Sequence, residues 1–265
     1  MHPFEDLQVA DDQAGIHWFG QSSYAIKDSQ GTIVQVDPYF PRERPPDRFV
    51  HARSPLDEAT LPTDFILLTH HHGDHTCIES ILRIQAAYPE VCCIGPKESV
   101  QAVQEAGIPV AQTQTLTAGQ SAAMNGMTAH AVWSKPPGGI PAESIDPPGV
   151  EHLGYVIDTG AARIYLSGDP VHSFAEHEEL VAPVRALQPD IGFLTTHPSE
   201  GEFPFLEGAA RLARKIGLKT AVPSHYQCFV RRDYDPQEFI RALHGAGGVQ
   251  GLIIAYNQSV LYSPR

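Results

Sequence analysis

A dense histidine cluster is the feature of this 265-residue chain whose residue types and spacing could carry out chemistry. Four of its 14 histidines lie between positions 70 and 75, in the segment THHHGDH that directly follows the apolar run FILL. In an extended loop, residues two positions apart point the same way, so His70 and His72 can bind one metal ion. Gly73 permits a sharp turn that brings Asp74 and His75 to a second ion. Imidazole and carboxylate ligands suit Zn²⁺, and also Mn²⁺ or Fe²⁺.

Two coordination shells need more ligands than this segment supplies, and two other predicted strand ends offer them. Asp169, in YLSGD, ends the second strand of a predicted hairpin, and its carboxylate could bridge two cations. His225, in VPSHY, follows another short apolar strand. Asp37, in VQVDP, ends a third strand and could orient a ligating imidazole without touching the metal. The expected metal ligands are His70, His72, Asp74, His75, Asp169 and His225.

The elements that must position these residues are short strands and amphipathic helices. Alternating and apolar runs bounded by turn residues predict strands at 16–19, 23–26, 32–36, 65–69 and 91–94, and a hairpin formed by 153–157 and 163–166. Helical periodicity predicts helices at 76–88, 97–106, 174–187, 206–216 and 236–243, with strands at 191–195 and 220–222 between the last three. Two successive halves of strands followed by helices favour an α/β fold with two sheets packed face to face and helices outside.

Composition limits the classes of partner. The 18 Lys and Arg residues against 31 Asp and Glu residues give a net charge of −13, which disfavours a nucleic acid as partner because phosphate binding needs basic residues. No apolar run approaches the roughly 18 residues of a membrane helix, and the acidic N-terminus MHPFEDLQVADD does not resemble a signal peptide. We expect a cytoplasmic, single-domain protein over residues 1–265, with no membrane partner, that could form a homo-oligomer.

Two segments are expected to be active-site loops. Residues 41–62 contain five prolines and four arginines, and loops of this length are uncommon unless they are functional or disordered. Residues 136–149, PPGGIPAESIDPPG, are stiffened by proline and turned by glycine. The alternative for both is a solvated surface excursion. The arginines of the first segment would favour a small anionic substrate.

The motif THHHGDH resembles the THxHxDH signature of the metallo-β-lactamase superfamily. The segments IVQVDP, CIGPKESV, GYVIDTGAARIYLSGDP and VPSHYQCF look most like the branch that contains L-ascorbate-6-phosphate lactonase and related metal-dependent hydrolases. The resemblance implies a four-layer αββα sandwich with a binuclear site at one edge of the two sheets. It places His70 and His72 on the first ion and Asp74, His75 and His225 on the second, with Asp169 as the bridge.

The sequence leaves the third protein ligand of the first ion open. Many members of the superfamily supply a third histidine to the first ion from the strand before the hairpin, and here that region reads MTAHAVWSKPP. His130 lies there, although Ser134 could occupy the ligand position instead. His152 and His197 are further candidates, and His197, at the end of a predicted strand, is also a candidate catalytic residue. The third ligand is therefore His130, His152, His197 or none.

The expected function is hydrolysis of an ester-like bond, with a lactone or sugar-phosphate lactone favoured, by a hydroxide that two divalent ions, Zn²⁺ or Mn²⁺, activate. Asp74 would hold and orient the hydroxide, and Asp169 would bridge the ions. One alternative is a phosphodiesterase or nuclease of the same superfamily. The other is an iron-dependent redox relative or a degenerate metal-binding protein. The substrate-binding residues are unknown at this stage.

Overall fold

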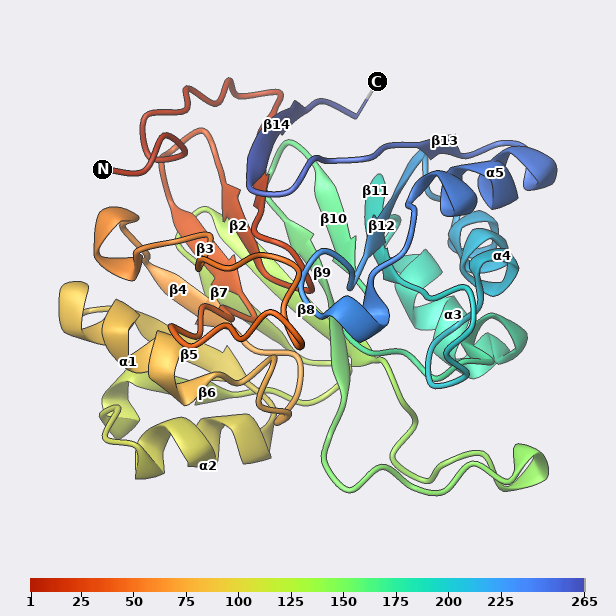
Figure 1. Ribbon diagram of the computed structural model, residues 1–265, viewed down its shortest axis with the longest axis horizontal. Helices are drawn as coiled ribbons and strands as arrows, with labels where there is room; N and C mark the ends of the chain where they lie inside the picture. Colours follow the sequence, from red (N-terminus) through yellow and green to blue (C-terminus); the bar gives the residue numbers. More distant parts are fainter. Residues whose placement is uncertain (265) are drawn as a thin grey trace.

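Two seven-stranded sheets packed face to face form the centre of the molecule (Figure 1). The computed structural model describes residues 1–264. The first sheet contains, in spatial order, β14 (Gln258–Tyr262), β1 (Ala14–Trp18), β2 (Tyr24–Lys27), β3 (Ile33–Val36), β4 (Phe65–Leu67), β5 (Cys92–Gly95) and β6 (Thr113–Thr115). The second contains β13 (Gln250–Gly251), β12 (Thr220–Ser224), β11 (Ile191–Thr195), β10 (Arg163–Leu166), β9 (Leu153–Asp158), β8 (Met127–Trp133) and β7 (Ser121–Met124).

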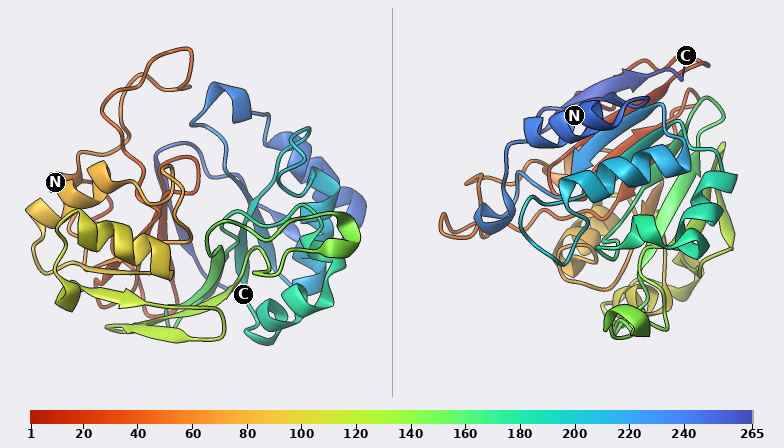
Figure 2. Two further views of the ribbon diagram at one scale, coloured as in Figure 1. Left: turned by 90° about the horizontal axis from the view of Figure 1, so that it is seen from below. Right: turned by 90° about the vertical axis from the view of Figure 1, so that its right-hand side faces the viewer.

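Helices cover the outer face of each sheet, which produces four layers (Figure 2). Helices α1 (Ile78–Ala87) and α2 (Lys97–Glu105) belong to the first sheet, and α3 (Glu178–Ala186), α4 (Leu206–Ile216) and α5 (Gln237–Ala246) belong to the second. The apolar faces of the two sheets form one core that includes Trp18, Tyr155 and Phe193. Separate apolar clusters lie under α1 and α2 and under the other three helices. The predicted αββα sandwich is confirmed.

The sequence pattern predicts most of these elements, but it gives no separate bounds for β6, β7 and β8 and does not predict the last two strands. The predicted helix at 206–216 matches α4, and the hairpin at 153–166 matches β9 and β10 to within a residue. The C-terminal strands β13 and β14 were not expected. Over residues 1–264, no helix combines the length and apolar character that crossing a membrane requires.

Both expected loops lie beside the predicted site. Residues 41–62 pair with the segment after β12: Val50 N–H donates to Cys228 O, and Val230 N–H donates to Arg48 O. Residues 136–149 contain a single short 3₁₀ turn, Pro141–Glu143. Each loop contributes residues to a cavity that also contains His72, so neither is only a surface excursion.

Candidate metal centre

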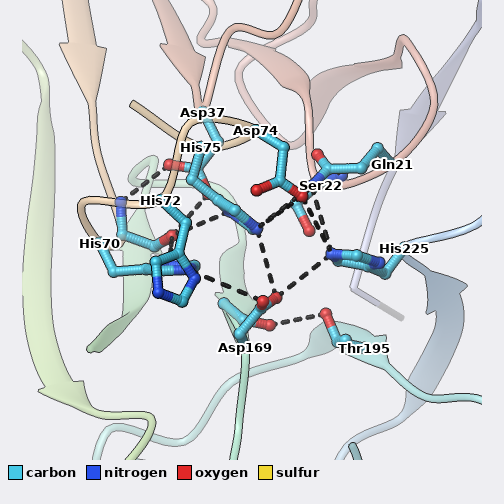
Figure 3. Close-up of polar contacts among 12 residues, drawn as sticks. Gln21, Ser22, Asp37, His70, His72, Asp74, His75, Asp169, Thr195 and His225 are labelled. Carbon is cyan, nitrogen blue, oxygen red and sulfur yellow. Dashed lines mark hydrogen bonds and ion pairs between the residues drawn. The ribbon is translucent and has the colours of Figure 1, made fainter. Parts of the chain in front are cut away.

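The predicted ligands gather at one edge of the two sheets because they follow the carboxyl ends of strands (Figure 3). Strands β3 and β4 run parallel in the first sheet, and β10, β11 and β12 run parallel in the second. Carboxyl ends of parallel strands meet at the same edge of a sheet. Asp37 directly follows β3, the histidine segment follows β4, Asp169 follows β10 and His225 directly follows β12.

Three imidazoles form the first group, which consists of His70, His72 and His152. Their candidate ligand atoms lie within 4.8 Å of one another. His70 Nε2 is 3.0 Å from His72 Nδ1, and the rings of His70 and His152 stack with centroids 4.1 Å apart. His72 is exposed, whereas the other two are buried. The group can thus hold an ion that remains accessible from one side.

Asp74, His75 and His225 form the second group, again with ligand atoms within 4.8 Å of one another. Asp169 lies between the two groups. Its Oδ2 is 3.7 Å from His70 Nε2, and its Oδ1 is 3.4 Å from His75 Nε2 and 3.5 Å from His225 Nε2. One carboxylate therefore faces imidazoles of both groups, as a bridging ligand would.

Asp37 fixes the orientation of the His75 ring through Nδ1, the nitrogen on the side away from Asp169. Its Oδ2 is 2.7 Å from His75 Nδ1 and accepts a hydrogen bond from Thr69 Oγ1, and its Oδ1 accepts one from Thr69 N–H. Asp37 is fully buried and belongs to neither group. A carboxylate that engages one ring nitrogen leaves the other free to bind a metal, which is the arrangement expected of a residue outside the coordination shell.

Burial and neighbouring charges determine which of the proposed ligands are protonated. Burial raises the pKa of Asp169, but the neighbouring His75 and His225 outweigh it and hold the pKa well below its usual value. Burial lowers the pKa of His70 well below its usual value, and lowers that of His152 to about 3. Burial also lowers the pKa of His225. These three imidazoles are therefore neutral at pH 7, which is the form that binds metal.

The local backbone is shaped to present these side chains. Asp37 and His225 have left-handed φ values of 43° and 69°, which non-glycine residues seldom adopt and which cluster at functional sites. Gly168, directly before Asp169, has a φ of 58°, and a Cβ atom there would lie 2.5 Å from Leu153 O. Only glycine fits position 168, so the sequence SGD sets the direction of the Asp169 carboxylate.

The donor set fits divalent metal ions. Asp169 Oδ1 is buried in the middle of the cluster and has no hydrogen-bond partner among residues 1–264. A buried carboxylate oxygen without a partner is costly unless a cation or a donor meets it. The surrounding atoms are imidazole nitrogens and carboxylate oxygens, the ligands of Zn²⁺ and Mn²⁺.

The third histidine of the first group is His152, one of the candidates that the sequence left open. It directly precedes β9, which runs antiparallel to β10, so it lies beside the residues that follow β10. The predicted hairpin already contained this signal. His130 lies on β8 and lines a different cavity beside α3. The hydroxyl of Ser134, the other candidate in that segment, donates to Ser167 O instead.

His197 belongs to neither of these two candidate groups, and it joins no other candidate metal-ligand group among residues 1–264. Its Nδ1 accepts hydrogen bonds from the amides of Ser199 and Glu200, and its ring packs edge-on to Tyr234. Burial lowers its pKa. Nδ1 of His197 is thus engaged by its own loop, and the catalytic role of His197 stays a prediction.

A cavity of about 590 Å³ opens over the cluster and provides room for a substrate. His72, Asp74 and Asp169 lie in its wall. The rest of the wall includes Tyr39, Arg48, Phe229, Arg231, Arg232 and Glu202. A second cavity of about 330 Å³, which also contains His72, lies under residues 136–149.

Gln21 is a site residue that the sequence analysis does not identify. It follows β1 and Gly20, has a left-handed φ of 52°, and is 1% exposed. Its side-chain amide contacts Asp74, His75 and His225. The only sequence signal is its position after an apolar strand, a position that Asp37, Asp169 and His225 share.

Comparisons with known proteins agree with this geometry. Residues 32–226 match the family described as the beta-lactamase superfamily domain. A UPF0173 metal-dependent hydrolase of Pyrobaculum neutrophilum is 27% identical over 229 residues, which cover 84% of this chain and 89% of the relative.

Solved structures share the fold at low identity. Igni18, a metallo hydrolase of the archaeon Ignicoccus hospitalis, superposes with a TM-score of 0.70 at 19% identity and covers 94% of this chain and 98% of its own. An isothiocyanate hydrolase from Delia radicum gut bacteria gives a TM-score of 0.72 at 16% identity, covering 95% of this chain and all of its own. The family match spans well over half of the chain, including both histidine-bearing sheet edges, and the chain therefore belongs to the metallo-β-lactamase superfamily.

Proposed function

We propose that this chain is a metal-dependent hydrolase that uses two divalent ions, Zn²⁺ or Mn²⁺, to cleave an ester-like bond in a small anionic molecule. A lactone, or the lactone of a phosphorylated sugar, is the substrate class that we favour. The observation that carries the proposal is the position of Asp169, whose two oxygens face different groups of imidazoles. Relatives named as metal-dependent hydrolases support the hydrolytic class.

The residues of the site would have two roles, binding the ions and orienting the attacking water. His70, His72 and His152 would hold one ion, and Asp74, His75 and His225 the other, with Asp169 shared. Such ions, when bound, would lower the pKa of water toward about 7, as at zinc, and would polarise the carbonyl oxygen of the ester. Asp74 lines the cavity and is partly exposed, so it can accept a hydrogen bond from the attacking water and orient it.

Arg48 supports an anionic substrate. Arg231 and Arg232 also line the cavity, but they form salt bridges with Glu200 and Glu202. The Arg48 guanidinium instead lies over aromatic rings, 5.4 Å from the Phe49 centroid and 5.5 Å from that of Phe229, and forms no salt bridge with any residue from 1 to 264. An exposed guanidinium on an aromatic surface is placed to bind a carboxylate or phosphate.

A substrate screen on protein loaded with Zn²⁺ or Mn²⁺ tests the reaction class. Sugar lactones, phosphorylated sugar lactones and a chromogenic bis-phosphate ester form its three arms, and Asp169→Asn is the inactive control. We expect lactone hydrolysis that the substitution abolishes. Turnover of the phosphodiester alone would overturn the proposed substrate, and a fully loaded protein that cleaves no ester would overturn the proposed class.

Arg48→Ala tests the substrate charge. We expect KM for a phosphorylated lactone to rise about tenfold, because a charge-assisted hydrogen bond is lost, while KM for a neutral lactone stays unchanged. Arg53→Ala is the matched control, since Arg53 is an exposed arginine of the same loop that does not line the cavity. Equal effects of Arg48→Ala on both lactones would contradict the assignment.

A further inference from the structure

The side-chain amide of Gln21 faces all three members of the second group of proposed ligands (Figure 3). Its Nε2 is 3.2 Å from Asp74 Oδ2, 3.1 Å from His75 Nε2 and 3.2 Å from His225 Nε2. An amide NH₂ group carries two hydrogens, so it cannot donate to all three atoms at once. Hydrogen bonding therefore does not fully account for this convergence.

The distances are those between ligands of one metal ion. Two atoms that each bind an ion at about 2.1 Å, at right angles to one another, lie about 3 Å apart. The terminal amide atom of Gln21 stands at this separation from all three members of the group. Asp169 Oδ1 stands 3.4 and 3.5 Å from the same two imidazole nitrogens. Figure 3 shows Asp169 on one side of those nitrogens, and Gln21 with Asp74 on the other.

We propose that Gln21 is a fifth protein ligand of the second ion and binds it through its side-chain oxygen. This inference rests on the proposed two-ion centre. An amide nitrogen has no lone pair available for a cation, whereas an amide oxygen has two. Half a turn about the Cγ–Cδ bond exchanges the two atoms, which places Oε1 where Nε2 stands. The second ion then has two imidazole ligands and three oxygen ligands.

The half-turn changes the hydrogen bonds of the neighbouring residue. Ser22 N–H donates to Gln21 Oε1, and this bond is given up when the amide turns. The turned NH₂ group then faces the Ser22 N–H, which is also a donor, so the half-turn costs one hydrogen bond that binding of the ion must offset.

The backbone holds Gln21 in place for this role. Gln21 N–H donates to Tyr226 O, and Gln21 O accepts hydrogen bonds from His225 N–H and from the Trp18 ring N–H. Gln21 is thus fixed to the strand end that carries His225, even though the two residues are 204 positions apart. The left-handed φ of 52° at a residue other than glycine indicates strain that this network maintains.

Metal titration of two variants tests the proposal. Gln21→Glu keeps an oxygen at the same reach, and Gln21→Met keeps the length without an oxygen or a donor. We expect Gln21→Met to raise the Kd for the second ion at least about tenfold. Gln21→Glu should bind this ion as tightly as the original chain or more tightly. The loss in Gln21→Met should be larger for Mn²⁺ than for Zn²⁺, because zinc is satisfied by four ligands. The Kd of each ion by calorimetry and the number of bound ions per chain are the measurements.

Each outcome separates the possible roles of Gln21. If both variants lower the affinity for the second ion equally, Gln21 acts as an N–H donor and the ligand assignment is wrong. If both bind two ions as the original chain does, Gln21 only packs, and the inference is again wrong. If the original chain does not bind two ions, the proposed two-ion centre itself fails. Gln35→Leu is the control, because Gln35 is fully buried but its side-chain NH₂ donates to Thr63, away from the ligands.

Discussion

Asp169 has the most demanding environment of any side chain in the site. Its carboxylate is buried and ionised among His70, His75 and His225, and one oxygen has no hydrogen-bond partner over residues 1–264. Such a group is stable only with positive charge beside it, supplied by bound cations or by His75, whose pKa the neighbouring carboxylates hold well above its usual value against the effect of burial. The carboxylate is thus the residue on which the two groups of ligands depend.

Asp169→Asn should remove both ions together. The neutral amide cannot bridge two cations, so we expect fewer than one ion per chain by elemental analysis and no hydrolysis of any ester. Asp158→Asn, which changes an aspartate whose carboxylate pairs with Arg163, should leave two ions bound. Retention of both ions by the Asp169→Asn variant would contradict a bridging role.

His152→Ala should remove only the first ion. His152 belongs to the group of His70 and His72 and not to the group of Asp74. We therefore expect one ion per chain, and His130→Ala should keep two because His130 lines the cavity beside α3. If His130→Ala loses an ion and His152→Ala does not, the assignment of the third histidine is wrong.

The sequence predicts those site residues that directly follow an apolar strand or lie just beyond its end. Asp37, Asp169 and His225 were predicted because each follows an apolar strand, and the structure brings them to one edge. His152 precedes its strand, so it meets the others only because β9 is antiparallel to β10. Gln21 could not be predicted, because an amide is a weak signal for metal binding and its contacts depend on the pairing of segments remote in sequence.

At the scale of the elements, the loop of residues 41–62 forms one wall of the cavity and is held at its base by Glu58. The carboxylate of Glu58 is 1% exposed and forms salt bridges with Arg42, from the same loop, and Arg83, from α1. The loop was expected from its length and its prolines. Its anchor was not, because Glu58 and Arg83 are distant in sequence and their pairing is a tertiary contact.

Glu58→Gln should loosen this loop. The substitution removes the buried charge and places an NH₂ donor against one of the two arginines, so we expect the free energy of unfolding to fall by about 1–3 kcal/mol, and proteolytic cleavage within 41–62 to become faster. Urea denaturation and limited proteolysis are the measurements. Glu178→Gln, which breaks a salt bridge with Arg185 between two exposed side chains, should change neither. Unchanged cleavage of the Glu58→Gln variant would show that other contacts hold the loop.

The helices were better predicted than the last strands, for a physical reason. Helix α4 has a clear apolar face that includes Leu206, Leu212 and Ile216, so its periodicity defines both ends. Strand β14, QSVLY, is an edge strand whose residues are all exposed or half-buried. Its place in the sheet depends on pairing with β1, 240 residues earlier, and local pattern contains no signal for that pairing.

At the scale of the whole molecule, His17 joins the first strand to the C-terminal segment. Its Nδ1 is 2.8 Å from Ser259 Oγ, and its Nε2 is 2.9 Å from Asn257 Oδ1. The ring also packs on Phe19, with centroids 4.3 Å apart. Through these contacts the last residues of the chain complete the sheet that its first residues begin.

This contact should make stability depend on pH. Burial lowers the pKa of His17 to about 4, against a smaller raising effect of Asn257. The unfolded chain takes up a proton below about pH 6.5, while the folded chain does so only near pH 4, so His17 contributes stability above pH 6.5 that is lost as the pH falls toward 4. His17→Gln should flatten this part of the curve in urea denaturation, and His244→Gln, at an exposed site on α5, should not. Parallel curves for His17→Gln and the original chain would contradict the prediction.

The number of bound metal ions tests the account most directly. The measurement is elemental analysis of protein purified without chelator or a metal-affinity tag, before and after reconstitution with Zn²⁺ or Mn²⁺. We expect two divalent ions per chain, because two groups of ligands share Asp169. One ion per chain after reconstitution would contradict the two-ion centre, and none would contradict a metal-dependent function altogether.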